Sequence, residues 1–419
     1  MERRVLVVQC AGLGWNLLER SAKLRHWKLP FAPVVSVFPA VTCPVQATMR
    51  TALPPAGHSI IANGRYDRER FQTEFWGQSA AVIKGKRLWE GFSGRTAVLF
   101  FQQSLGEKNW LTLSPEPIHR HHGGMIPALH CNQPAWERRL EKSLGPFPLH
   151  RYWGPLANRK STDWIVGATA MLLREEHPEL VFTYLPHLDY VQQKEGPASS
   201  NIPRECDVLL EDLDALLTVA TRENYECCIY GDYAITKVRR PVFPNRLLRE
   251  AGLFRCREVK GMLYPNLYDS SAFALCDHQV AHLYLQNQAA LSSIRNLLNG
   301  TAGIASVQTR DDCDLPETAG DLVLTADADS WFAYSWWDTP REAPDYASHV
   351  DIHHKIGYDP CELFWKIPFL RTSQNAWKVR GSHGRLDIPA ALAVSDGLAK
   401  LRNATSLLEL AHLLRRAMQ

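Results

Sequence analysis

The stretch FPAVTCPVQATMRTALPPAGHSIIANGRYD, from Phe38 to Asp67, decides the fold of this 419-residue chain. It carries a threonine, Thr42, between two prolines, then a histidine, His58, after a proline-rich turn, and an asparagine, Asn63. Taken singly, each residue is ordinary, because a threonine in such a place most simply caps a turn or a helix. Their combination at this spacing is specific, whereas any one piece alone is a weak signal.

The combination resembles the nucleophile region of the nucleotide pyrophosphatase/phosphodiesterase family, within the alkaline phosphatase superfamily. In that family a Pro-x-x-Thr-x-Pro stretch is followed by a Thr-Gly-like turn, a Pro-x-x-His-Gly-Ile-like turn and an asparagine. Here Pro39, Thr42 and Pro44 match the first stretch, and His58 and Asn63 match the later parts. Further matches are LPHLDYVQQKEGP at 185–197, GDYAIT at 231–236, GDLVLTADADSWFAY at 320–334 and GSHGRL at 381–386. The resemblance therefore extends over nearly the whole chain.

The resemblance implies a metal-dependent hydrolase of phosphate esters. Two metal ions can neutralise the phosphate, lower the pKa of a hydroxyl nucleophile and stabilise the leaving oxygen. Thr42 would attack phosphorus to give a covalent phosphothreonine, which water then opens. Asn63 matches the asparagine that donates a hydrogen bond to a phosphoryl oxygen. His58 belongs to a turn, where a hydrogen-bonded structural histidine is expected.

The resemblance also implies metal ligands, and here the chain departs from the family. One metal takes an aspartate and a histidine from an Asp-x-x-x-His-x-x-Gly-Pro stretch, together with a late histidine. At these positions the chain has Asp189, Gln193 in place of the first histidine, and His383.

The second metal of the family takes an aspartate after the first strand, the nucleophile, and an Asp-His pair. The aspartate position here is Ala11, or Gln9 if the turn is gapped, and the pair is Asp232 followed by Tyr233. Losing one carboxylate and two imidazoles removes donors that favour zinc. We expect one or two divalent ions, zinc by resemblance, or magnesium, manganese or calcium through oxygen ligands.

Further side chains are auxiliary candidates to replace the lost ligands or to bind substrate phosphate. The segment VDIHHKIGYDP supplies Asp351, His353 and His354. His187 would point to the same side as Asp189 if both lie on an extended strand end. A polar loop packed under a cap is the alternative for the segment at 350–360.

The order of apolar runs and helical patterns predicts an α/β protein with a doubly wound, mostly parallel central sheet flanked by helices. Ligands of such sheets gather beyond the carboxyl ends of the strands, which places the residues around Gln9, Asp189 and Asp232 near one edge. The expected strands are 5–8, 34–37, 96–101, 180–184, 227–230 and the segment before Gly381. The expected helices are 161–176, 207–221, 289–299 and 404–418, the last a packed terminal helix with one apolar face.

Residues 238–375 have their own strand and helix pattern, which predicts a smaller α+β cap inserted into a core of residues 1–237 and 376–419. Within it, the aromatic cluster Trp331 to Trp337 would either face the site or, as is commoner for alternating aromatics, fill the core. The run HRHHGG at 119–124 lies outside every matched motif, and we expect a solvated loop there.

The bulk properties exclude several classes of protein. The formal net charge is +3, from 47 basic and 44 acidic side chains, which gives no nucleic-acid-binding patch and no membrane-surface signal. No apolar stretch approaches the length of a membrane span, and the N-terminal apolar run is too short for a signal peptide. The ten cysteines show no CxxC pairs and are expected to be reduced. These observations predict a cytoplasmic protein with a small phosphorylated substrate and leave its oligomeric state open.

Two hypotheses for function follow. The first is a phosphodiesterase-like or nucleotide pyrophosphatase-like hydrolase, favoured because Thr42 and Asn63 persist together. The alternative is a non-catalytic binder of a phosphorylated metabolite or partner protein, motivated by the changes at Ala11, Gln193 and Tyr233. Another reaction of the superfamily, such as phosphonate hydrolysis or phosphoryl transfer, is a third option, because one fold supports many chemistries.

Overall fold

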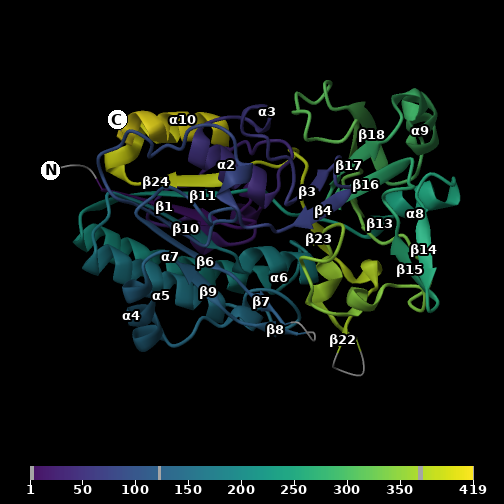
Figure 1. Ribbon diagram of the computed structural model, residues 1–419. Helices are drawn as coiled ribbons and strands as arrows, with labels where there is room; N and C mark the ends of the chain where they lie inside the picture. Colours follow the sequence, from purple (N-terminus) through teal and green to yellow (C-terminus); the bar gives the residue numbers. More distant parts are fainter. Residues whose placement is uncertain (1–3, 121–123, 367–370, 419) are drawn as a thin grey trace.

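The computed structural model describes residues 4–120, 124–366 and 371–418. Figure 1 shows two adjoining parts. One is built on a large sheet with helices on both faces and holds both chain ends, and the other is built on a smaller sheet.

The main sheet has eight strands, and its five central strands, β11-β1-β10-β5-β6, are parallel. Antiparallel strands complete both sides. The central strands are mostly apolar and are buried along almost their whole length, because helices cover both faces. The predicted fold class is thereby confirmed. In spatial order the strands are β2 (Ala32–Val34), β24 (Ala390–Val394), β11 (Tyr225–Gly231), β1 (Arg4–Cys10), β10 (Leu180–Leu185), β5 (Thr96–Leu99), β6 (Leu111–Pro115) and β9 (Leu129–Cys131).

Helices cover the two faces of this sheet, as Figure 1 shows. On one face, α10 packs on α2, and Leu407, Leu410, Ala411 and Leu414 of α10 are buried. The opposite face is covered by α4, α5 and α7, with α6 beside α7. The helices of this part are α1 (Ala22–Arg25), α2 (Thr42–Thr51), α3 (Pro55–His58), α4 (Pro134–Leu144), α5 (Lys160–Glu175), α6 (His187–Glu195), α7 (Ile202–Arg222) and α10 (Leu407–Met418).

The second part contains a four-stranded antiparallel sheet and its own apolar core. Phe75, from a hairpin far earlier in the chain, belongs to this core, so the division into 1–237, 238–375 and 376–419 stays a prediction. The elements are β16 (Ala272–Asp277), β17 (Val280–Leu285), β19 (Leu322–Ala326), β18 (Ile304–Thr309), α8 (Pro244–Glu250), α9 (Leu291–Leu298), and the pairs β3 (Gly64–Asp67) with β4 (Gln72–Phe75), β13 (Arg240–Val242) with β20 (Ser330–Phe332), and β14 (Cys256–Val259) with β15 (Met262–Pro265).

Three short two-stranded pairs complete the described strands. They are β7 (Ile118–His119) with β8 (Met125–Ile126), β12 (Thr236–Lys237) with β23 (Gly381–Ser382), and β21 (Trp365–Lys366) with β22 (Arg371–Thr372).

Some expected elements differ from the structure. The segment before Gly381 is a short 3-10 helix, Ala376–Lys378, and the late strand of the main sheet is instead β24, an alanine-rich run. Alanine has low intrinsic strand preference, so the packing of β24 between two strands determines its conformation. The strand expected at 34–37 ends at Val34, and the terminal helix begins at Leu407.

The aromatic cluster belongs to the interior. Trp331 and Trp336 are almost completely buried, and Trp336 donates its indole N–H to the Leu263 carbonyl over 2.9 Å. The cluster therefore fills the core and offers no shelf to the site.

All ten cysteines are free thiols, and most are buried. Among the described residues, no helix has the length and apolar character needed to cross a membrane. The cytoplasmic location stays a prediction.

Candidate active site

Three neighbouring strands of the main sheet end at one edge and bring candidate residues together there. β1 lies between β10 and β11, and all three run parallel. Asp189 lies in the first turn of α6, which follows β10, and Asp232 directly follows β11. Thr42 is the first residue of α2. The edge lies at the carboxyl ends of the strands, where α/β sheets bind ligands.

The Tyr233 hydroxyl links the Thr42 hydroxyl to Asp189. It lies 3.1 Å from Thr42 Oγ1 and donates to Asp189 Oδ1 over 3.1 Å. Because its proton points at Asp189, its oxygen accepts the hydrogen bond from Thr42. Asp189 Oδ2 accepts from Gln193 Nε2 over 2.7 Å, and Gln193 Oε1 accepts from the Tyr358 hydroxyl over 2.6 Å. A continuous hydrogen-bonded chain therefore runs from Thr42 to Tyr358.

Asp232 is held in a second, deeper set of hydrogen bonds. Its Oδ2 accepts from Gln9 Nε2 over 2.8 Å, and its Oδ1 accepts from the Gly12 and Tyr233 backbone N–H groups over 2.9 and 3.0 Å. Gln9 Oε1 accepts from the Tyr230 hydroxyl. Of the two alternatives for the strand-end position, Gln9 therefore meets Asp232. Ala11 is buried and carries no polar side-chain group.

Burial governs the ionisation of both carboxyl groups, because desolvation disfavours the charged form. It raises the pKa of Asp189 to about 7, while the hydrogen bonds from Tyr233 and Gln193 oppose that rise. It raises the pKa of Asp232 to about 8. Near pH 7 Asp232 is therefore mainly protonated, and the site carries less negative charge than two ionised carboxylates would give it.

Four aromatic rings form a column that connects the two parts of the molecule. Tyr233 stacks on His383 with ring centroids 3.5 Å apart and planes inclined by 6°. His383 lies 3.6 Å from His278, and His278 lies 3.7 Å from Tyr358. Burial lowers the pKa of His383 to about 3 and that of His278 well below its usual value, so both imidazoles are neutral. The stack on His383 holds the Tyr233 ring in place without using its hydroxyl group. The hydroxyl is therefore available to bond Thr42 and Asp189.

The described donors do not fit a two-metal centre. Among the described residues, no three His, Cys, Asp or Glu side chains converge as a metal ion requires. His383 Nδ1 bonds the Ala40 carbonyl, and its buried Nε2 has no hydrogen-bond partner and lies 3.7 Å from Asp189 Oδ1. These two side chains are one donor short of the three protein ligands of catalytic zinc sites. Gln193 and Tyr233, at the other ligand positions, bond to Asp189 instead.

Asn63 lies beside the start of α2, but its side chain has partners within the protein. Its Nδ2 donates to Asp277 Oδ1 over 3.1 Å, and its Oδ1 accepts from the Cys43 backbone N–H over 3.0 Å. It does not line the cavity that Thr42 lines. Its role as a donor to phosphate stays a prediction. His58 is structural as expected, because its Nε2 is hydrogen-bonded to the Thr48 hydroxyl over 3.0 Å.

His187 does not share a side with Asp189. The two residues lie in α6, not on an extended strand end, and residues two apart on a helix point in nearly opposite directions. His187 faces α7, where its Nε2 is 3.3 Å from the Glu205 carbonyl oxygen. The expectation of a shared direction was wrong because the helix begins immediately after β10.

Asp351 and His353 line the outer part of the cavity, and His354 is exposed next to them. His354 Nδ1 lies 2.7 Å from Asp351 Oδ1, and His353 Nδ1 lies 3.2 Å from the Phe75 carbonyl oxygen. None of these three side chains is hydrogen-bonded to Asp189 or Asp232. They therefore do not replace the metal ligands that the chain lacks. His119 also lines this cavity, 5.2 Å from His353 between ring centroids. It is exposed, as expected, but it lies in strand β7 and not in a loop. Residues 121–123 of the same run lie outside the described residues.

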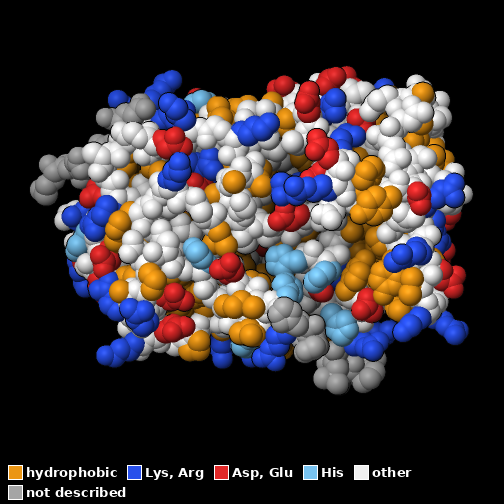
Figure 2. Space-filling view, in the orientation of Figure 1, with side chains coloured by type: hydrophobic (Ala, Val, Ile, Leu, Met, Phe, Trp, Pro, Cys, Tyr) orange, Lys and Arg blue, Asp and Glu red, His pale blue; other side chains and the backbone are white. Residues whose placement is uncertain are grey.

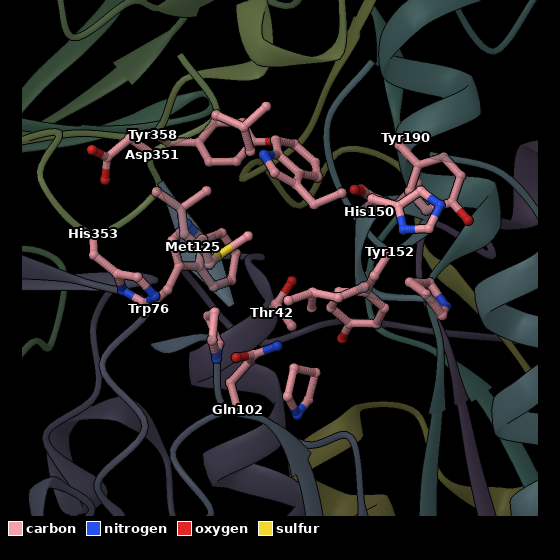
Figure 3. Close-up of a pocket in the computed structure, with 18 of the residues that line it drawn as sticks. Thr42, Trp76, Gln102, Met125, His150, Tyr152, Tyr190, Asp351, His353 and Tyr358 are labelled. Atoms are coloured by element: carbon pink, nitrogen blue, oxygen red, sulfur yellow. The ribbon is translucent and has the colours of Figure 1, made fainter. Parts of the chain in front are cut away.

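A cavity of about 280 Å³ opens above Thr42. Figure 3 shows Thr42 deep among aromatic side chains, with Tyr152 on one side and Trp76 and Met125 on the other. Asp189 and Tyr233 also line it, so the hydrogen-bonded chain reaches the cavity. The aromatic wall comprises Trp76, Tyr152, Trp153, Tyr184, Tyr190, Tyr358 and Trp365.

Sequence reasoning missed this aromatic wall. Its members come from separate segments around residues 76, 152, 190 and 358, and no local spacing unites them. An isolated tryptophan or tyrosine is more often a core residue, so only the tertiary structure identifies these as cavity residues.

Comparisons with known proteins identify relatives of this arrangement. A family model described as Type I phosphodiesterase / nucleotide pyrophosphatase matches residues 5–359. No curated protein matches the sequence significantly.

Solved structures with the same fold include a phosphonoacetate hydrolase from Sinorhizobium meliloti 1021, in complex with phosphonoacetate. It aligns with a TM-score of 0.63 and 15% identity over 100% of this chain and 96% of its own. Murine ectonucleotide pyrophosphatase / phosphodiesterase 5 aligns with a TM-score of 0.60 and 14% identity over 99% of this chain and 95% of its own. The murine protein is also known as an inactive threonine-to-alanine variant in complex with AMP. At these identities the structural likeness shows the fold.

Proposed function

This chain belongs to the type I phosphodiesterase / nucleotide pyrophosphatase family of phosphoester hydrolases, and on that premise we propose that it cleaves phosphate esters with Thr42 as the nucleophile. The observation that carries the proposal is the hydrogen bond from Thr42 Oγ1 to Tyr233, which continues to Asp189 at the base of the cavity. A hydroxyl nucleophile needs an acceptor for its proton within hydrogen-bond reach, and this geometry provides one. The inactive threonine-to-alanine variant of the murine relative supports the same assignment.

The position of Thr42 at the start of α2 favours a negatively charged group. α2 runs for ten residues, and the positive end of its dipole lies at Thr42. The Cys43 N–H is already bonded to Asn63 Oδ1 and Pro44 has no N–H, so the helix dipole, and not a set of free N–H groups, favours an anion there. The partly protonated carboxyl groups of Asp189 and Asp232 also reduce repulsion of an anionic substrate.

The reaction proceeds in two steps. The Thr42 oxygen bonds to phosphorus as the bond from phosphorus to the leaving oxygen breaks. The Thr42 proton passes to Tyr233 as the Tyr233 proton passes to Asp189, and a water molecule gives the leaving oxygen its proton as the alcohol departs. Asp189 later returns its proton to the hydroxide formed from that water. Water then attacks the phosphothreonine, releases the phosphoryl product and restores the Thr42 hydroxyl. Because the described donors do not fit a metal centre, this proton path runs through side chains of the chain itself.

The proposal is tested by trapping the covalent intermediate. The protein is incubated with bis(4-nitrophenyl) phosphate, 4-nitrophenyl phosphate and a phosphonate ester, with and without added divalent ions, then quenched in acid. We expect nitrophenol release and a phosphoryl adduct on the peptide that contains Thr42, both absent in Thr42→Ala. Folded protein that releases no product and carries no adduct with any of these esters would refute the proposal. If such protein still binds them, the non-catalytic alternative takes its place.

A further inference from the structure

The phosphoryl oxygens of the substrate need hydrogen-bond donors or cations beside them, because they carry negative charge while Thr42 attacks phosphorus. No lysine or arginine is among the described residues that line the cavity. Asn63 does not line it, and its amide nitrogen already donates to Asp277 over 3.1 Å. The described donors also do not fit a metal centre. Another side chain of the cavity must therefore supply the hydrogen bond.

The buried histidines of the cavity do not supply a cation either. Figure 2 shows histidine side chains gathered beside a hollow near the centre of the face it displays. His278 and His353 line the cavity, and burial lowers the pKa of both, so they are neutral near pH 7. Neutral donors such as amide groups can perform the same task when they are held in place.

Gln102 lies at the same edge of the main sheet as Asp189. It follows β5, which runs parallel to its neighbour β10, so the carboxyl ends of both strands meet at this edge. Gln102 lines the cavity together with Thr42 and is only 7% exposed. Figure 3 shows its amide nitrogen on the side of Thr42 and its amide oxygen on the opposite side. Its N–H groups are therefore directed into the part of the cavity that Thr42 reaches.

The backbone of Gln102 is fixed to the helix that carries Thr42. Its N–H donates to Gln46 Oε1 over 2.7 Å, and its carbonyl accepts from Arg50 Nη2 over 2.8 Å. Gln46 and Arg50 both belong to α2. Arg50 is completely buried, and Glu107 balances its charge over 3.2 Å. These contacts hold Gln102 and Thr42 in a fixed relation, as a preorganised donor requires.

A neighbouring glutamine fixes the orientation of the Gln102 amide group. Gln78 Nε2 donates to Gln102 Oε1 over 2.6 Å and to the Trp76 carbonyl over 3.3 Å. The contact with a carbonyl identifies the Gln78 atom as a nitrogen, so the Gln102 atom that faces it is the oxygen. Gln102 Nε2 then lies beside Tyr152, where it opposes the rise in the Tyr152 pKa that burial causes. An amide nitrogen carries two N–H groups, so one remains to donate into the cavity.

We propose that Gln102 is a further catalytic residue, whose amide N–H donates to a non-bridging phosphoryl oxygen while Thr42 attacks phosphorus. This inference rests on the proposed function for the position of the phosphorus. Asn63, whose Oδ1 accepts from the Cys43 N–H, then stabilises the start of α2 and does not contact the substrate. Gln102 lies outside every segment that resembles the family, so the sequence alone does not point to it.

The test compares Gln102→Met with Gln103→Met. Methionine has nearly the length of glutamine but no N–H donor, and the bonds from both residues to α2 use backbone atoms and persist. Gln103 is the matched control, because it is also 7% exposed and does not line the cavity above Thr42. With bis(4-nitrophenyl) phosphate we expect kcat to fall by about 10²–10³-fold in Gln102→Met and to stay within roughly threefold of the native value in Gln103→Met. KM should change much less than kcat, because the hydrogen bond is strongest in the transition state.

A second measurement does not depend on turnover. Orthovanadate adopts a trigonal bipyramidal geometry on a hydroxyl nucleophile and so resembles the transition state of phosphoryl transfer. Its Kd is measured by calorimetry for the native protein and for both variants. We expect Gln102→Met to weaken vanadate binding by at least roughly tenfold, which is the effect of a lost hydrogen bond to a charged group, and Gln103→Met to leave it unchanged.

The outcomes separate this inference from the proposed function. A Gln102→Met variant that keeps kcat and vanadate affinity within roughly threefold of those of Gln103→Met overturns the assignment of Gln102. A Thr42 adduct in the native protein leaves the proposed function standing in that case. If the native protein releases no nitrophenol but binds vanadate, and only Gln102→Met weakens that binding, the donor assignment stands and the proposed chemistry fails. Folded native protein that neither cleaves the ester nor binds vanadate overturns both.

Discussion

Replacing Tyr233 by phenylalanine removes one hydroxyl group from the centre of the site and leaves the ring in place. The ring keeps its stack on His383, with centroids 3.5 Å apart, because stacking does not involve the hydroxyl. Two buried hydrogen bonds are lost, one with Thr42 and one with Asp189. Asp189 keeps its bond from Gln193. The change therefore isolates the hydrogen-bonded link between Thr42 and the carboxyl group.

The magnitudes follow from these contacts. Leaving a buried polar group without its partner costs about 1–3 kcal/mol, so we expect the free energy of unfolding to fall by that amount. Removing a proton acceptor from a catalytic path typically lowers turnover by about 10²–10⁴-fold. The pKa of Asp189 should also rise, because the hydrogen bond from Tyr233 is one of the contacts that lowers it.

Tyr358→Phe is the matched control. It removes another buried tyrosine hydroxyl, which donates to Gln193 and not to Thr42. Urea unfolding followed by fluorescence, and initial rates with bis(4-nitrophenyl) phosphate, are measured for both variants and the native protein. We expect comparable losses of stability and a large loss of kcat in Tyr233→Phe alone. A Tyr233→Phe variant that retains kcat within roughly tenfold of the Tyr358→Phe variant would refute the proton path.

Three further predictions follow from the site and its surroundings. Protein purified without chelator should contain less than one zinc ion per chain by elemental mass spectrometry, because the site has too few donors. The double variant Gln193→His, Tyr233→His should contain more zinc. One zinc ion per chain in the native protein would contradict this prediction. Burial raises the pKa of Asp232 to about 8 and that of Asp277 to about 7, so both bind protons in the folded state that the unfolded chain has released. Their contribution to stability is present at low pH and is lost as pH rises through these pKa values. The Tm measured by scanning fluorimetry should therefore fall between pH 6.5 and 8. A Tm that rises steadily over that range would contradict this prediction. His278→Ala removes the middle of the ring column and with it two ring pairs, each worth about 0.5–1.5 kcal/mol. Its urea unfolding midpoint should be clearly lower than that of His412→Ala, which changes an exposed histidine outside the column. Equal midpoints would show that the column does not stabilise the protein.

The sequence was sufficient for the fold class and the family. The apolar runs of β1, β10 and β11 and the nucleophile motif around Thr42 are local features, and a parallel sheet brings the ends of such strands to one edge by its geometry alone. The absence of histidine at positions 193 and 233 could also be recognised in the sequence, and it predicts a weakened metal centre.

The sequence did not determine what replaces that centre. The bond from Tyr233 to both Thr42 and Asp189, and the stack of Tyr233 on His383, join residues that are far apart in the chain. The same holds for the aromatic cavity, whose side chains come from segments without a shared motif. Local patterns encode strands, helices and short motifs, because these depend on neighbouring residues. The ionisation of Asp189 and the shape of the cavity depend instead on burial and on contacts between distant segments, and these exist only once the chain has folded.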